Sequence, residues 1–291
     1  MENSGRKLYT EKLSFIHPLF SIEKSNRYTL LFEFHSSELT YGIVEQDTNL
    51  LLLFKEIRAL QFSKNGAAEW VSHYFSQEEL FSTRNWKKIC LNIASDKITL
   101  VPTAFYTENK KEEFLNFNHI VDLNENKVLV DHLRSVDSYL LYAVNSKLNK
   151  VFDQFFPGNK IMCSGTVFLN SVFTEIPSLT NSVAINIRES FFELLIFNDG
   201  LKFYNIFPYQ GVDDFLYFLL AGCEQNKVNP SFSELFIVGN CDVQSDLINS
   251  IRNYFEKISF GISEKTVTRE KIMTEVPSHF YFTLFTRLNC E

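Results

Sequence analysis

Three β-rich apolar runs follow one another early in the chain. Residues 28–60 read YTLLFEFHSSELTYGIVEQDTNLLLLFKEIRAL, in which the polar stretches HSSE and QDTN separate the runs. Ser, Asp and Asn favour tight turns because their side chains bond to the neighbouring backbone. The pattern therefore predicts an antiparallel meander of three strands.

Helical and extended patterns alternate over the next part of the chain. Residues 66–80, GAAEWVSHYFSQEEL, have helical spacing that places Trp70, Tyr74 and Phe75 on one side and polar residues opposite. Residues 86–106 predict two strands with a turn between them. The polar run TENKKEEFLNF that follows predicts the start of another helix.

From Ser138 the chain alternates between strand and helix patterns, in the runs SYLLYAVNS, KLNKVFDQFF, NKIMCSG and TVFLNSVFTEI. Alternation of this kind predicts parallel strands joined by crossover helices. Pro177 and Ser178 mark the predicted domain boundary. Beyond it come three β-rich runs, a helix from about Gly211, the strand ELFIVGN and a helix over VQSDLINSIRNYF. The second half thus repeats the plan of the first.

The repeat aligns without a gap. Residues 29–43, TLLFEFHSSELTYGI, lie over residues 182–196, SVAINIRESFFELLI, and seven matched positions are apolar in both copies. Apolar matches between two strands are common by chance. Each meander also leads to a strand–helix unit, so the sequence predicts an internal duplication of a βββαβα unit.

Composition narrows the classes of protein that the chain can belong to. The formal charge of −7 argues against nonspecific binding to nucleic acid or anionic lipid, which needs clustered Lys and Arg. The five cysteines are scattered without the paired spacing of a zinc site or a redox dithiol, and the histidines show no metal-ligand spacing. No run approaches the ~20 apolar residues of a membrane span, and the start MENSGRKLYTEKLSF has no apolar core of a signal sequence. We expect a cytoplasmic protein without membrane insertion.

The second half carries a family resemblance, in NIRESFFELLIFNDGLKFYNIFPYQGVDDFLYFLLAGCEQNKVNP and the later ELFIVGN. These residues resemble the actin-like ATPase superfamily and, more closely, an uncharacterised bacterial domain-of-unknown-function family with an actin-like fold. The resemblance covers roughly residues 28–288. It implies an α/β fold of two lobes, each a ribonuclease-H-like βββαβα unit with a mixed sheet. Residues 1–177 would form the first lobe, with an insertion near 60–135, and residues 178–291 the second.

In that superfamily each lobe begins with a strand ending in D-x-G, whose carboxylate orders magnesium-bound water and whose amides approach the phosphates. Here the first copy has Glu33 in place of the acid, and the second has Asn186; neither copy keeps the glycine that a close backbone approach needs. The resemblance leaves Glu33 as a candidate magnesium ligand and Arg188 as a candidate phosphate contact. The competing interpretation of Arg188 is a surface turn paired with Glu189 or Glu193.

The superfamily's nucleoside contact is a strand followed by two glycines. The run LFIVGNCDVQSDL keeps Gly239 and replaces the second glycine with Asn240, which tolerates the same turn. Asp242 then suits the N-cap of the next helix. We favour a structural turn here over a nucleoside contact.

Two functions follow from these observations. The first is a non-catalytic actin-like protein, without catalytic residues, metal or cofactor, that binds an unidentified protein partner or itself. The alternative is a divergent nucleotide-binding ATPase or kinase-like enzyme that holds ATP with magnesium on Glu33, Arg188 and Gly239. An open inter-lobe cleft lined by polar groups would favour the alternative, and one filled with Phe and Tyr would exclude it. The aromatics of SHFYFTLFTRL, near the C-terminus, would cover the second lobe or a neighbouring subunit.

Overall fold

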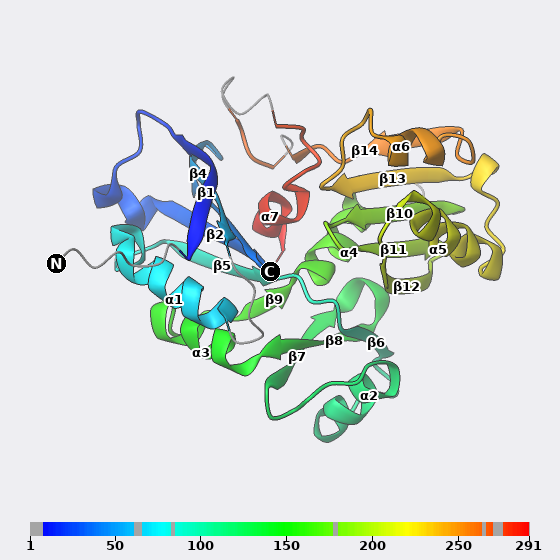
Figure 1. Ribbon diagram of the computed structural model, residues 1–291, viewed down its shortest axis with the longest axis horizontal. Coiled ribbons are helices and arrows are strands. Elements are labelled where there is room, and N and C mark those ends of the chain that lie inside the picture. Colours follow the sequence, from blue (N-terminus) through cyan, green and yellow to red (C-terminus); the bar gives the residue numbers. More distant parts are fainter. Residues whose placement is uncertain are drawn as a thin grey trace.

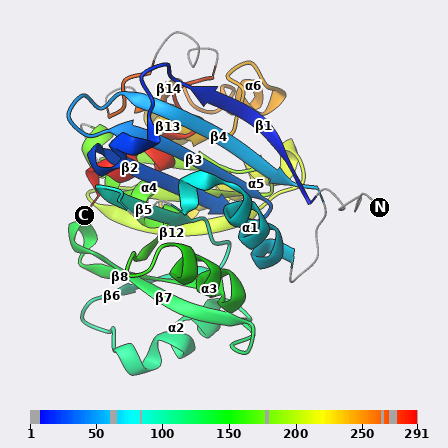
Figure 2. The ribbon, with the colours of Figure 1, turned by 90° about the vertical axis from the view of Figure 1, so that its left-hand side faces the viewer.

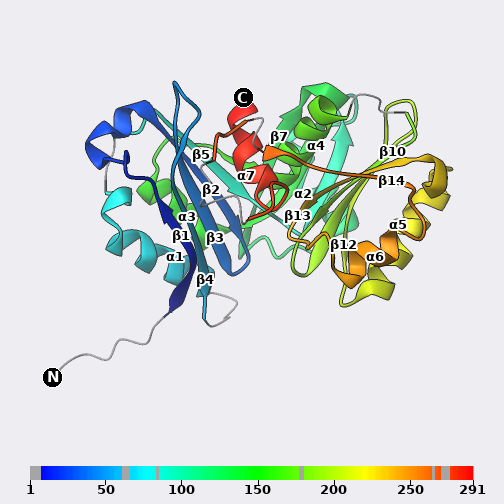
Figure 3. The same cartoon turned by 90° about the horizontal axis from the view of Figure 1, so that it is seen from above.

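The computed structural model describes residues 8–60, 66–82, 85–176, 180–263, 266–269 and 276–290. The predicted boundary at Pro177 and Ser178 lies outside these residues. The chain forms two α/β bodies side by side, with a small third sheet beneath them in Figure 1. A short C-terminal helix lies between the two large sheets (Figures 1 and 3).

The first sheet has six strands in the order β1-β4-β3-β2-β5-β9. Their bounds are β1 Tyr9–Ile16, β4 Leu51–Ala59, β3 Glu38–Glu45, β2 Tyr28–His35, β5 Lys88–Ile93 and β9 Ile161–Cys163. Strands β2, β3 and β4 pair antiparallel, which confirms the predicted meander. Strands β5 and β9 continue the sheet in parallel, so the sheet is mixed.

The two faces of β2 pack against different parts of the chain, because successive strand residues point to opposite faces. Phe32 and Phe34 face helix α1 (Gly66–Gln77), whose buried residues include Trp70 and Phe75 as predicted. Figure 2 shows α1 lying over this face. The opposite face of β2 carries Leu31 and Glu33 and meets the C-terminal helix.

The second sheet repeats the first. Its order is β12-β11-β10-β13-β14, with bounds Leu201–Pro208, Phe191–Phe197, Ser182–Ile187, Glu234–Gly239 and Lys257–Phe260. The register places Leu30 opposite Ile43 in the first sheet and Val183 opposite Ile196 in the second, which are the pairs that the gapless repeat aligns. The duplication predicted from the sequence is confirmed. Helices α5 (Val212–Gln225) and α6 (Asp246–Ile251) cover the outer face of this sheet.

The third sheet corrects one prediction. Strands β6 (Ile98–Pro102), β8 (Ser138–Asn145) and β7 (Asn126–Leu133) form a separate antiparallel sheet in the order β6-β8-β7, backed by α2 (Lys111–Asn118). The expectation of a parallel strand from Ser138 is therefore wrong. A strand–helix alternation does not reveal which sheet a strand joins, and here β8 returns beside β6 and β7. Only β9, after helix α3 (Ser146–Phe155), enters the main sheet in parallel.

Helix α4 (Ser164–Glu175) joins the two bodies. Its Phe168, Leu169 and Val172 belong to a continuous apolar core that includes residues of the inner face of the second sheet. Within the described residues, 3₁₀ helices lie at Ile22–Arg27, Glu79–Phe81, Glu108–Lys110, Arg134–Val136, Pro230–Phe232 and Arg287–Asn289. None of the described helices is long and apolar enough to cross a membrane.

The C-terminal helix α7 (Phe282–Thr286) packs on both sheets. Phe285 and Leu284 lie in one cluster with Leu31 and other residues of the first sheet, and the ring of Phe282 lies 5.7 Å from that of Phe236 in the second. The aromatics expected to cover the second lobe therefore also cover the first. The division at residues 177 and 178 stays a prediction, as does the insertion near 60–135, a range within which α1 and β5 belong to the main body.

Candidate functional site

The ends of β2 and β10, which correspond in the two repeats, meet where the lobes touch. Arg188 directly follows β10, and its Nη1 donates to Oε1 of Glu33 at 2.5 Å. Both side chains are buried, with 11% of Arg188 and 8% of Glu33 exposed. The structure thus brings together two of the three residues singled out from the sequence, and it bonds them to each other.

Two further hydroxyl groups complete the shell of the Glu33 carboxylate. Thr283 of α7 donates to Oε2 at 2.7 Å, and Ser164 at the start of α4 donates to the same atom at 3.0 Å. Arg188 also donates to the Thr283 hydroxyl, at 3.1 Å. Burial by itself would raise the pKa of Glu33, but the Arg188 charge and these donors outweigh it and hold that pKa below its ordinary value. Glu33 is therefore an ionised, fully bonded carboxylate.

A second buried carboxylate lies close by. Glu193 of β11 accepts from Nδ2 of Asn186 at 2.7 Å and from the Tyr204 hydroxyl at 2.5 Å. Burial raises the pKa of Glu193, and the nearby Arg188 only partly offsets this. Gly165 of α4 sits against this pair, and a Cβ there would overlap the Tyr204 hydroxyl. The absence of a side chain lets the first turn of α4 approach the second sheet.

The strands of the first sheet contact the β10–β11 hairpin of the second. Arg58 of β4 donates to Glu38 at 3.0 Å and pairs with Glu189, in the turn after β10, at 3.5 Å. The ring of His35 lies 5.2 Å from that of Phe191. Burial, reinforced by the Arg188 charge, lowers the pKa of His35 to about 4, so this ring is neutral at pH 7. The interpretation of Arg188 as a surface residue paired with Glu189 or Glu193 is wrong, because its partner is Glu33.

The third candidate, Gly239, ends β13. Its φ of +95° lies in the region that favours glycine, and a Cβ there would overlap the Ile187 carbonyl oxygen. The Gly239 amide donates to the His279 carbonyl at 2.8 Å, and the Asn240 amide donates to Ile187 at 2.7 Å. The amides of this turn are thus bonded within the chain, and no hydrogen bond recorded for the described residues links Gly239 to Glu33 or Arg188.

The helix after this turn begins later than expected. Helix α6 starts at Asp246 with Ser245 as its N-cap, and the Ser245 hydroxyl accepts from the Ile248 amide. Asp242, predicted as the cap, instead accepts from the Gln244 amide at 2.7 Å in the preceding turn. The assignment of Asp242 as N-cap is therefore wrong.

A small cavity of about 170 Å³ remains between the turns. It is smaller than the roughly 300–1,000 Å³ of pockets that hold drug-sized ligands. The cavity is neither the open polar cleft nor the cleft filled with Phe and Tyr that would separate the two functions. The Glu33–Arg188 ion pair and other polar side chains line it together with two aromatic residues, Phe280 and Tyr281. The cavity is lined by Glu33, His35, Glu38, Thr40, Glu56, Arg188, Glu189, Asn240, Phe280 and Tyr281.

The described residues hold no group of three or more His, Cys, Asp or Glu placed to bind a metal ion. All five cysteines are buried and free of disulfides. What the site can do chemically is hold two sheets together: its charges and hydroxyl groups are paired with one another.

Residues 17–258 match the family described as protein of unknown function (DUF3822). The chain belongs to this family. No curated protein matches its sequence. This member of DUF3822 is similar to a Bacteroides thetaiotaomicron protein with an actin-like ATPase fold and unknown function. The TM-score is 0.77 at 17% identity, over 94% of this chain and all of the other.

A chain of the PilM–PilN type IV pilus biogenesis complex is also similar, with a TM-score of 0.55 at 12% identity over 90% of this chain and 98% of that one. At such identities the likeness shows the fold alone. Together with the two mixed sheets, it establishes that this DUF3822 protein has the two-lobed actin-like ATPase fold predicted from the sequence.

The sequence did not single out three members of the site, Ser164, Thr283 and Tyr204, and it offered Glu193 only as a surface partner of Arg188. The sequence does mark Glu193, because it is a carboxylate inside the apolar strand FFELLIF. If both faces of that strand are buried, the carboxylate needs hydrogen-bond partners to offset the cost of burial. The sequence does not mark Thr283, since its position depends on how the C-terminal segment crosses back to the first sheet.

Proposed function

We propose that this DUF3822 protein is a non-catalytic actin-like protein that acts by binding another protein. The observation that carries the proposal is the bond between Glu33 and Arg188. These residues stand where the superfamily would use one turn for magnesium and the other for phosphate. In this chain each is the other's partner, and Thr283 bonds to both.

Opening this site for a nucleotide is costly. A phosphate that took Arg188 would leave the Glu33 carboxylate buried and unpaired, and breaking a buried pair in this way costs about 3–5 kcal/mol. A bound nucleoside would also find no free backbone amide at Gly239 or Asn240, since both amides are already bonded within the chain. A ligand would have to offset both losses before it gained any affinity.

Protein binding is supported by the fold and by the absence of other chemistry. One structure with this fold is a chain of a complex between two proteins, PilM and PilN. The chain keeps the two-lobed architecture, but the residues at its two phosphate positions bond to each other. What remains for its action is a surface that another protein can bind. The partner is another protein or a second copy of this chain.

Thermal unfolding with and without magnesium-ATP tests the non-catalytic part. A ligand at about a hundred times its dissociation constant adds about 2.7 kcal/mol, which raises the midpoint of a chain of this length by several degrees. We expect no shift and no hydrolysis. A shift that Glu33→Ala abolishes, and that the exposed control Glu224→Ala keeps, would overturn the proposal.

Cross-linking in cells that naturally express the chain tests the protein-binding part. We expect the tagged chain to recover one protein, or itself, and the tagged partner to recover the chain in return. A chain that stays monomeric at all concentrations and gives no reciprocal recovery would contradict it.

A further inference from the structure

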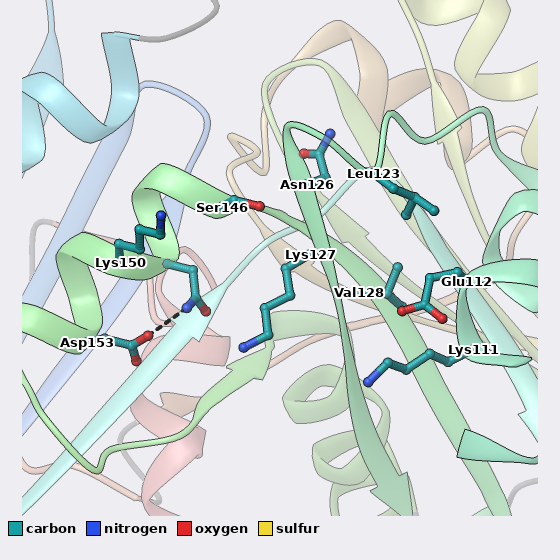
Figure 4. A pocket seen from close by; sticks show the side chains of 10 residues that line it. Lys111, Glu112, Leu123, Asn126, Lys127, Val128, Ser146, Lys150 and Asp153 are labelled. Atoms are coloured by element: carbon teal, nitrogen blue, oxygen red, sulfur yellow. Dashed lines mark hydrogen bonds between the residues drawn. The ribbon is translucent and has the colours of Figure 1, made fainter. Parts of the chain in front are cut away.

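A groove of about 610 Å³ lies on the three-stranded sheet, between α2, β7 and α3 (Figure 4). It is far larger than the cavity between the lobes and lies within the size range of binding pockets. It is lined by Lys111, Glu112, Leu123, Asn126, Lys127, Val128, Ser146, Asn149, Lys150 and Asp153.

The groove follows the free edge of β7. Among the strands that the structure describes, β7 pairs with β8 alone and is therefore an edge strand. Asn126, Lys127 and Val128 are consecutive and all line the groove. Successive strand residues point to opposite faces, so a groove that meets three in a row runs beside the strand and not over one face. Among the described residues, no backbone hydrogen bond is recorded from 127–133 other than those to β8. An open edge of this kind accepts another extended segment.

The groove carries charges of both signs, and its β7 and α3 side has more cations than anions. Lys111, Lys127 and Lys150 line it together with Glu112 and Asp153, in a chain whose overall charge is −7. Lys111 is bonded to Glu108, and Asp153 accepts from Asn149, the bond drawn in Figure 4. Within the described part of the chain, no carboxylate oxygen lies within 4.0 Å of the ammonium groups of Lys127 and Lys150. These two charges are available to a ligand.

An apolar side chain stands at the groove as well. Leu123, in the loop before β7, is 47% exposed, and Val128 beside it is buried in the small core under α2. The groove therefore offers three kinds of contact at once: a strand edge, two unpaired ammonium groups and an exposed Leu.

We propose that this groove binds an extended, acidic segment of the partner protein. The segment adds a strand to the free edge of β7, sets carboxylates beside Lys127 and Lys150, and packs an apolar residue on Leu123. This inference rests on the proposed function and names the surface and the class of partner segment. An acidic segment suits the β7 and α3 side of the groove, because the ammonium groups of Lys127 and Lys150 outnumber the one carboxylate there, that of Asp153.

Labelled synthetic peptides of about eight residues, a usual strand length, provide the test by fluorescence anisotropy. The first peptide alternates Glu with Val and Leu, the second replaces every Glu with Gln, and the third keeps Glu but carries N-methyl groups on alternate amides. We expect only the first to bind well, with an affinity that falls as salt is added. The N-methyl groups remove the donors that strand addition needs.

Charge-reversal variants locate the binding. We expect the double variant Lys127→Glu/Lys150→Glu to bind the first peptide with about tenfold lower affinity, since the reversed charges remove attraction and add repulsion. The matched control is Lys257→Glu, on the exposed edge of the second sheet, which we expect to bind the peptide as the native chain does. A circular dichroism spectrum confirms that each variant is folded.

Several results would overturn the inference. They are failure of all three peptides to bind, equal binding by the Glu and N-methylated peptides, and equal binding by the double variant and the control. Pyrophosphate that displaces the peptide and binds alone with similar affinity would instead identify a site for small anions. These outcomes leave the reciprocal recovery of a partner untouched, so a failure of the groove is distinguishable from a failure of the proposed function.

Discussion

Glu33 and Arg188 lie 155 residues apart in the chain and form one buried ion pair that joins the two sheets. Glu33 lies two residues before the end of β2, and Arg188 directly follows β10. The pair therefore bonds the two lobes together at the place where the superfamily would leave room for a nucleotide. Four expected outcomes follow from this bond and from the residues packed around it.

Removing the cation of the pair should be costly. We expect Arg188→Met to lower the free energy of unfolding by about 3–5 kcal/mol, because it leaves Glu33 ionised in the interior. The double variant Arg188→Met/Glu33→Gln should lose less, since no charge then stays buried. Urea unfolding measures both. The control Arg58→Met, which removes the partly exposed pairs with Glu38 and Glu189, should cost about 1 kcal/mol or less. Equal losses for Arg188→Met and Arg58→Met would disprove the assignment.

Glu193 should make stability fall with rising pH. Its pKa in the folded chain is raised above its ordinary value, so the folded state holds a proton that the unfolded state has released. The stability it contributes is present below the unfolded pKa, near 4.5, and is lost as the pH rises through the folded pKa. Glu193→Gln stays neutral throughout. The difference in unfolding free energy between native chain and variant should therefore shift in the variant's favour from pH 4.5 upward. A difference that is constant with pH would show that folding does not raise the pKa of Glu193.

A methyl group at Gly165 should disturb the contact between α4 and the second sheet. We expect Gly165→Ala to cost about 1–3 kcal/mol, the usual range for overpacking a tight interior, because its Cβ would overlap the Tyr204 hydroxyl. Tyr204→Phe removes that hydroxyl, so the loss caused by Gly165→Ala should be smaller in a Tyr204→Phe background. A double-mutant cycle by urea unfolding measures this coupling. Additive losses would refute the steric explanation.

Gly239 should be less replaceable than a glycine with similar backbone angles elsewhere. Gly200 has φ of +99° and no atom near the position of a Cβ, whereas a Cβ on Gly239 would overlap the Ile187 carbonyl oxygen. Both changes to Ala carry the strain of a positive φ, about 1–3 kcal/mol. The Gly239→Ala variant should lose about 1–3 kcal/mol beyond that. Thermal or urea unfolding of the two variants measures the excess. If the two variants lose the same unfolding free energy, the close approach of Gly239 to Ile187 does not contribute to the cost of the substitution.

The sequence predicted the features that depend on neighbouring residues. The meander of β2, β3 and β4 follows from apolar alternation and turn residues, and the gapless repeat even gives its register, as the pairs Leu30–Ile43 and Val183–Ile196 show. The sequence failed where the outcome depends on distant partners. The strand at 138–145 has the pattern of any strand, and only the position of β6 and β7 decides that it joins the small sheet.

The candidate site shows the same limit. Glu33 and Arg188 could be singled out as unusual residues at strand ends, but their pairing depends on how the two lobes approach. Thr283 lies 250 residues from Glu33, and no local pattern marks it as a partner. The alternative of a surface turn for Arg188 failed for the same reason, since exposure is set by what packs above a turn and not by the turn itself.

The crossing of the last helix back to the first sheet affects how the protein is made. Leu284 and Phe285 cover a face of that sheet that includes Phe15, Leu31 and Phe54. A ribosome adds about 5–20 residues per second, and this face stays uncovered until residues 282–286 have been synthesised. The nascent first lobe thus exposes an apolar surface while the second lobe is being translated. We expect chaperones to bind this surface during that interval. A chain truncated before α7 would keep the surface exposed permanently.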